Sequence, residues 1–199
     1  MSPAERTAAF QLLLTLDHLD PPIWRRVIVD PDRTLADLHT IIQCVMPWQN
    51  SHLHRFTVRD TEYGVPHPSD FAPIHDERTL TLRAALSRIG AKIRYVYDFG
   101  DDWQHTLQLE ARLPTPAPLP QCVDGANACP PEDCGGPWGY VELLDALADP
   151  DHPDHDEKVE WIGDSFDPEA FDRDAANRSL EAALPLAGGS DHVAYPCPA

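Results

Sequence analysis

The chain has 199 residues, of which 42% are hydrophobic, which fits one domain or one domain with an appended helical segment. It contains no run of about 18 apolar residues and no recognisable secretory signal, so the sequence predicts a cytoplasmic protein without a membrane span. The formal net charge of −18 is uneven, because residues 113–199 carry 18 acidic and only 3 basic side chains. This segment would repel phosphate backbones, which argues against direct nucleic-acid binding. It is either a solvated acidic surface or a surface for a basic protein partner.

Period-two alternation of apolar residues predicts about five strands, at 10–16, 23–29, 52–58, 92–98 and 102–110. Thr34, with Asp37 three positions on, predicts the start of a helix whose apolar residues follow helical spacing, and Pro47 would end it. The proline-rich stretch PTPAPLP marks a connector, after which the patterns are helical.

These elements predict an α+β fold with a mixed or antiparallel sheet of about five strands and a crossing helix, resembling a β-grasp plan. The expected organisation begins with a sheet core over residues 1–113 and a Pro/Cys-rich connector over 114–135. An acidic helical segment packed on the core would follow over 136–187, and a frayed tail over 188–199.

The stretch YVYDFGDDWQH predicts a hairpin turn. The apolar faces of its two strands coincide only with an odd-numbered loop, so a three-residue loop would pair Tyr97 with Trp103 and Tyr95 with His105. Gly100 would supply a positive φ. The opposed carboxylates of Asp98 and Asp102 would repel each other, and turn capping, arginine pairing or a bound cation would each relieve this.

Two histidines precede this hairpin in the chain. His52 and His54 lie two residues apart on one strand face, a spacing that can chelate a metal ion. Together with carboxylates or a histidine of the hairpin they form the set of ligand or cation candidates His52, His54, Asp98, Asp101, Asp102 and His105. The alternative interpretation of His105 is a structural histidine packed among aromatic residues.

The five cysteines are an odd number, and reduced thiols are expected in an unexported chain. Three of them have the spacing C-x6-C-x4-C, and two histidines follow, so a zinc site would draw on Cys122, Cys129, Cys134, His152 and His155. The close cysteine pairs typical of structural zinc sites are absent. The alternative is a turn-rich loop in which the thiols pack as small apolar groups.

Five motifs together resemble the Ri-plasmid open-reading-frame-three-like family over residues 8–175: PIWRRVIV, SHLHRF, YVYDFGDDWQH, ACPPEDCGGPWGY and WIGDSFDPEAFD. The resemblance implies a compact α+β fold and a passenger protein of plasmids or mobile elements. The label resolvase-like, which some members carry, does not extend to this chain, because it shows no nucleophilic serine in an arginine-rich setting and no basic DNA-binding segment.

No P-loop, G-x-S-x-G, H-E-x-x-H or dinucleotide fingerprint is present in the sequence. This favours a non-catalytic accessory protein that binds a protein or a ligand. The alternatives are a metal-dependent, hydrolase-like enzyme that uses the HLH and YDFGDDWQH motifs, and a module stabilised structurally by zinc.

Overall fold

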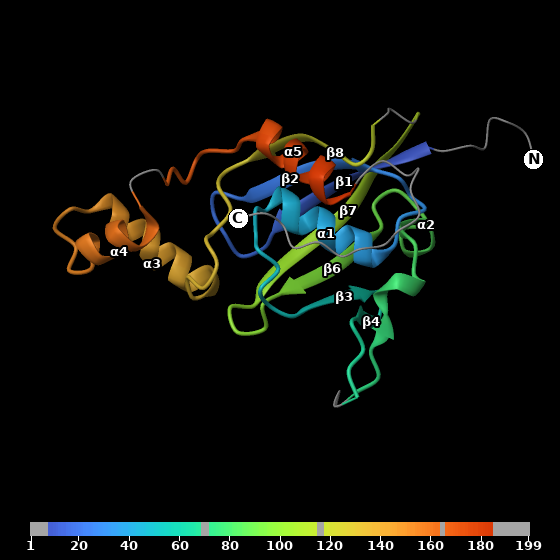
Figure 1. Ribbon diagram of the computed structural model, residues 1–199, viewed down its shortest axis with the longest axis horizontal. Coiled ribbons are helices and arrows are strands. Elements are labelled where there is room, and N and C mark those ends of the chain that lie inside the picture. The colour runs from blue at the N-terminus through green and yellow to red at the C-terminus, as the bar shows by residue number, and fades with distance from the viewer. Residues whose placement is uncertain (1–7, 69–71, 115–117, 164–165, 185–199) are drawn as a thin grey trace, which may run out of the picture.

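The computed structural model describes residues 8–68, 72–114, 118–163 and 166–184, and its centre is one eight-stranded sheet (Figure 1). The strand order is β5-β4-β3-β6-β7-β1-β2-β8, and every neighbouring pair is antiparallel except β4 and β5. The strands are β1 Ala8–Leu16, β2 Ile23–Val29, β3 His54–Val58, β4 Thr61–Gly64, β5 His75–Asp76, β6 Lys92–Tyr97, β7 Trp103–Pro114 and β8 Gln121–Ala126.

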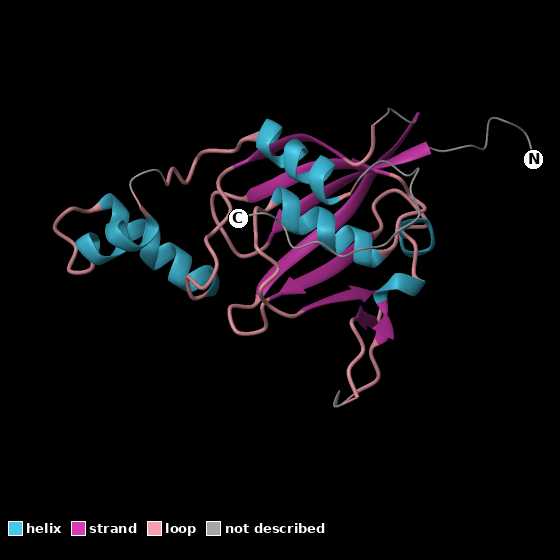
Figure 2. Cartoon of the chain, viewed as in Figure 1, coloured by secondary structure: helices cyan, strands magenta, loops and turns pink. Residues whose placement is uncertain are grey.

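The described α-helices are α1 Leu35–Val45, α2 Leu82–Ala85, α3 Gly136–Ala148, α4 His155–Ile162 and α5 Arg173–Ala183. Apart from the short α2, they fall into two groups (Figure 2). Helices α1 and α5 lie side by side over one face of the sheet, where the Cys44 thiol donates to the Ser179 carbonyl. Helices α3 and α4 form a lobe at one end of the sheet. Among the described residues, no helix is both long and apolar enough to cross a bilayer.

The core lies between the sheet and α1. In β1, residues 10, 12, 14 and 16 are buried while residues 11, 13 and 15 are partly exposed, so one face of the strand points inward. The apolar side of α1 covers this face with Leu38, Ile41, Ile42 and Val45, all fully buried. Each such side chain stabilises the fold by about 1.5–3 kcal/mol relative to an exposed one.

Both ends of α1 are fixed by side chains. The Thr34 side chain accepts from the Asp37 backbone N–H while the Asp37 carboxylate accepts from the Thr34 N–H, which confirms the predicted start of the helix. At the other end, the buried Arg25 donates from Nε to the Val45 carbonyl and from Nη1 to the Ala126 carbonyl. A cation is favourable at a helix C-terminus, and this one also joins α1 to β8.

The α+β class is confirmed, but the expected number of strands was too low. The strands β4, β5 and β8 were missed because they are short or lack a period-two pattern, and β8 lies inside the expected connector. The β-grasp plan is also wrong. In that plan the first strand runs parallel to the late strand beside it, whereas here β1 and its neighbour β7 are antiparallel.

The register of the β6–β7 hairpin is as predicted, with Tyr97 opposite Trp103 and Tyr95 opposite His105. The turn itself differs, because Asp98 and Asp102, each with a φ of 55°, take the left-handed conformation in place of Gly100. Aspartate tolerates this region better than most residues, and the Asp98 carboxylate accepts from the Gly100 N–H at 2.9 Å. Turn capping therefore accounts for one oxygen of Asp98.

Candidate metal centre

Three segments that are distant in the sequence meet at the β6–β7 turn. They are residues 48–54, which lead from α1 into β3, the turn 98–102, and the loop 127–135 before α3. The Asp98 N–H donates to the Leu53 carbonyl at 2.9 Å, and the Trp48 indole N–H donates to the Pro130 carbonyl at 3.0 Å. The first bond holds the segment before β3 against the β6–β7 turn, and the second holds the loop 127–135 against the segment after α1.

The two glycines at the start of α3, Gly135 at its N-cap and Gly136 as its first residue, allow the chain to approach the turn closely. The Gly135 N–H donates to an Asp101 carboxylate oxygen at 3.1 Å. Gly136 has a φ of +71°, and a Cβ atom on it would lie 2.3 Å from the Asp101 carbonyl oxygen. The CGGPWG and DFGDD motifs therefore contact each other directly.

The Glu132 carboxylate is held in place by this arrangement. It accepts from the Gln49 N–H at 2.7 Å and from the Tyr97 hydroxyl at 3.0 Å, and that hydroxyl in turn accepts from the Ser51 N–H. Burial and the adjacent Glu132 raise the pKa of Tyr97, so the phenol keeps its proton and remains a donor.

His52 lies among three carboxylates. Its Nδ1 is 3.6 Å from an Asp98 oxygen, and its Nε2 is 3.3 Å from a Glu132 oxygen and 3.1 Å from an Asp133 oxygen. The Nε2 atom is buried, yet among the described residues it has no hydrogen-bond partner of acceptable geometry. A cation bound at this point would contact both the unpaired imidazole nitrogen and the carboxylate oxygens around it.

His52, Asp98 and Asp133 each offer a ligand atom within 4.8 Å of the others, the one such group among the residues that the structure describes. Metal–nitrogen and metal–oxygen bonds to zinc are about 2 Å long, so an ion fits between them after small side-chain rotations. The Asp133 side chain is 71% exposed and free to rotate, whereas that of Asp98 is 12% exposed and fixed by the turn. The group thus combines an adjustable ligand, Asp133, with one that the turn holds in place, Asp98.

The other candidates from the hairpin are used structurally. Asp101 binds the Gly135 N–H, and the Asp102 carboxylate accepts from the Gln104 side chain at 2.6 Å. His105 is buried between Trp48 and Tyr95, and its Nδ1 lies 3.1 Å from the Trp103 carbonyl oxygen.

His54 lies apart from His52, in a buried polar network beneath α1. Its Nε2 is 2.7 Å from a Glu77 oxygen, and its ring stacks on that of His39 with centroids 3.5 Å apart. The His39 ring in turn contacts the Tyr95 hydroxyl and the Asn50 side chain. The two histidines of the HLH motif therefore have separate environments.

The structure does not bring the cysteines and histidines of the predicted zinc site into one group among the described residues. Cys122 lies in β8 and donates to the Asp124 carbonyl, whereas His155 begins α4 and its Nδ1 contacts the Ala146 carbonyl. The Nδ1 of His152 accepts from the Asp154 N–H.

Burial also suppresses the metal-binding form of the thiols. It raises the pKa of Cys122 to about 11 and that of Cys134 to about 12, and it raises the pKa of Cys129 as well. Because thiolates bind zinc, these environments favour packed, protonated thiols. None of the four described cysteines is in a disulfide, and Cys197 lies outside the described residues.

Glu132 and Asp133 were not among the candidates from the sequence. They stand more than thirty residues after Asp98, in a stretch whose cysteines and glycines were the more conspicuous signals. The adjacent glycine pair was the available sign that this loop approaches another segment closely.

Residues 8–175 match the plasmid pRiA4b ORF-3-like protein family. The chain is 43% identical to the uncharacterized protein y4hQ of Sinorhizobium fredii (strain NBRC 101917 / NGR234), over 85% of this chain and 86% of that protein. It is also similar to the crystal structure of MM3350, a protein of unknown function from Methanosarcina mazei Go1. That match has a TM-score of 0.76 and 38% identity, over 83% of this chain and 96% of the other. The chain therefore belongs to the plasmid pRiA4b ORF-3-like family.

Proposed function

We propose that this protein is a cytoplasmic, non-catalytic binding module whose ligand at the β6–β7 turn is a divalent transition-metal ion, held by His52, Asp98 and Asp133. The observation that carries the proposal is the buried Nε2 of His52, which lies 3.1–3.3 Å from two carboxylate oxygens without a hydrogen bond. Reduced cysteines are consistent with the cytoplasm.

The donor set favours a transition metal over magnesium or calcium. An imidazole nitrogen suits zinc, iron, nickel or copper, whereas all-oxygen sites suit the harder ions. Two ligating carboxylates balance the charge of a divalent ion. With Nε2 of His52 as the metal-binding nitrogen, Glu132, whose oxygen lies 3.3 Å from Nε2, stands beside the three ligands as a further negative charge.

The test is isothermal titration of the untagged full chain with Zn²⁺ and with Mn²⁺ after treatment with a chelator. We expect binding of one ion per chain, weakened by about a hundredfold or more in His52→Ala and by about tenfold or more in Asp133→Asn. Asp133 is the better variant for folding, because its side chain is 71% exposed.

The matched control is Asp102→Asn, which removes one carboxylate from the same turn but leaves the ligand group intact. It should bind the ions with the affinity of the unmodified chain. Equal affinities for the unmodified chain and His52→Ala would refute the site. Loss of binding in Cys134→Ser instead would assign the metal to the cysteine loop.

A further inference from the structure

The lobe formed by α3 and α4 exposes two tryptophans. Trp138 is 84% exposed and Trp161 is 50% exposed. Exposed tryptophans are enriched at surfaces that bind a partner, and Trp161, unlike Trp138, also lines a pocket.

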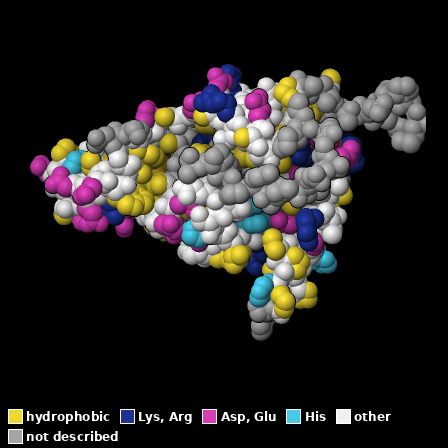
Figure 3. All heavy atoms as spheres, viewed as in Figure 1, with side chains coloured by type: hydrophobic (Ala, Val, Ile, Leu, Met, Phe, Trp, Pro, Cys, Tyr) yellow, Lys and Arg dark blue, Asp and Glu magenta, His cyan; other side chains and the backbone are white. Residues whose placement is uncertain are grey.

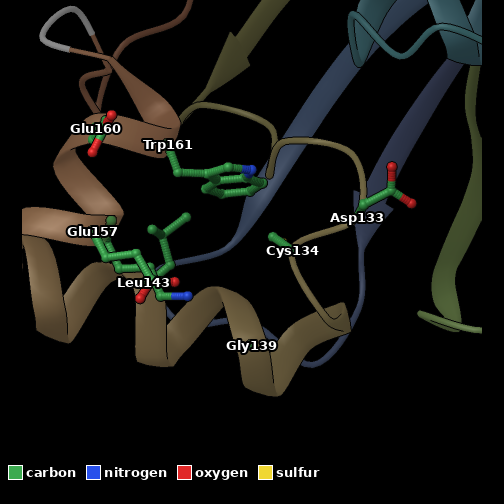
Figure 4. A pocket seen from close by; sticks show the side chains of 8 residues that line it. Asp133, Cys134, Gly139, Leu143, Glu157, Glu160 and Trp161 are labelled. Carbon is green, nitrogen blue, oxygen red and sulfur yellow. The ribbon is translucent and has the colours of Figure 1, made fainter. Parts of the chain in front are cut away.

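Trp161 borders a pocket of about 410 Å³ between the lobe and the loop before α3. In Figure 4 the indole ring extends from α4 towards Cys134, and Leu143 rises from α3 beneath it. Glu157 and Lys158 of α4 and Gly139 of α3 complete this side, and Glu160 and Asp133 stand at the edges. The pocket thus has an aromatic wall and an acidic rim.

The charge of the lobe has one sign. Residues 136–163 carry eight carboxylates and a single basic side chain, Lys158. Figure 3 shows acidic side chains gathered on the visible face of this lobe, next to hydrophobic ones. Around the pocket itself, Asp133, Glu157 and Glu160 outnumber the one ammonium group. Such a field attracts cations and repels nucleic acids.

We propose that this pocket binds an arginine side chain of a basic segment in a protein partner. A planar guanidinium group can stack on the Trp161 indole while it donates hydrogen bonds to the Glu157 or Glu160 carboxylate. The remaining carboxylates of the lobe attract the other basic residues of the segment. An uncharged apolar ligand would leave the acidic rim unused.

This site is separate from the proposed metal site, although Asp133 borders both. In Figure 4 the Asp133 carboxylate points away from Trp161, so the pocket depends mainly on α4. Its test is therefore made in the presence of a chelator, where a failure of metal binding has no effect on the result.

The experiment measures the fluorescence anisotropy of a labelled peptide of alternating arginine and glycine with the full chain at low ionic strength. The same peptide with citrulline in place of arginine keeps the shape and removes the charge. We expect saturable binding of the arginine peptide, at least about tenfold weaker for the citrulline peptide and for Trp161→Ala. Trp138→Ala, which lies outside the pocket, should bind normally.

Two double variants distinguish the effect of charge at the pocket from the effect of charge elsewhere on the lobe. Glu157→Gln/Glu160→Gln should weaken binding by about tenfold, whereas Glu142→Gln/Asp145→Asn removes the same charge from α3 and should weaken it by less than about threefold. Absence of binding, equal binding of the citrulline peptide, equal loss in the two double variants, or normal binding by Trp161→Ala would each overturn the proposal.

Discussion

Two buried histidines show how this core depends on protonation. The His39 ring lies between the Tyr95 hydroxyl, 2.8 Å from Nδ1, and the Asn50 side-chain oxygen, 2.9 Å from Nε2. A neutral ring satisfies both contacts by accepting from the tyrosine and donating to the asparagine. Burial lowers the pKa of His39 and of His105 to about 3, and the nearby His54 lowers that of His39 further in the same direction.

These pKa values predict a loss of stability in mild acid. Between pH 6.5 and about pH 3, the unfolded chain binds protons at His39 and His105 that the folded chain does not, so the free energy of unfolding falls as the pH falls. Each histidine contributes roughly 1 to 2 kcal/mol per pH unit within this window. Urea denaturation at a series of pH values from 6.5 downwards measures the slope.

The variant His105→Asn keeps a donor near the position of Nδ1 and removes the titrating ring, so its slope should be smaller by about one bound proton. His18→Asn is the matched control, because His18 is exposed and has a positive φ that asparagine tolerates. If the free energy of unfolding changes with pH equally in His105→Asn and in the unmodified chain, His105 does not cause the loss of stability in acid.

At the scale of elements, the contact between the β6–β7 turn and the start of α3 decides where the candidate ligands lie. The turn carries Asp98 and the loop carries Asp133, and Gly136 joins them through its approach to the Asp101 backbone. The candidate ligands would not lie together without this contact between the DFGDD turn and the CGGPWG segment.

Gly136→Ala tests this contact. The added methyl group would lie 2.3 Å from a backbone oxygen at a φ of +71°, so we expect unfolding to become easier by about 3 kcal/mol and metal binding to weaken because the loop shifts. Gly163→Ala is the control, since its φ is +81° and nothing lies within 4 Å of the added atom. It should cost only about 1 kcal/mol and leave metal binding unchanged. Equal effects of the two changes would exclude a special role for the contact.

At the scale of the whole molecule, local patterns predicted much of the fold. The alternation in residues 10–16, the capping box at Thr34 and the hairpin pairing of Tyr97 with Trp103 all depend on neighbours close in the sequence, and each is present. The short strands β4 and β5 at one end of the sheet were not predictable in this way, because they contain too few residues to show a period.

The candidate site was predictable only in part. His52 and Asp98 were selected because their types and motifs suggested ligands, and the structure brings them together. Asp133 and Glu132 join them through a loop that returns from the far edge strand β8, and no local pattern encodes such a long-range contact. His54 was assigned to the same group because it shares a strand face with His52, but His39 and Glu77 hold it in the interior.

The proposed function requires that one divalent ion binds between His52, Asp98 and Asp133. The most direct measurement is an anomalous difference map from crystals of the full chain grown with Zn²⁺, with data collected on both sides of the zinc absorption edge. We expect one strong peak per chain within about 2 Å of a His52 ring nitrogen and of oxygens from both aspartates. A map with its peak at Cys129 or Cys134, or with no peak beside His52 at saturating zinc, would contradict it.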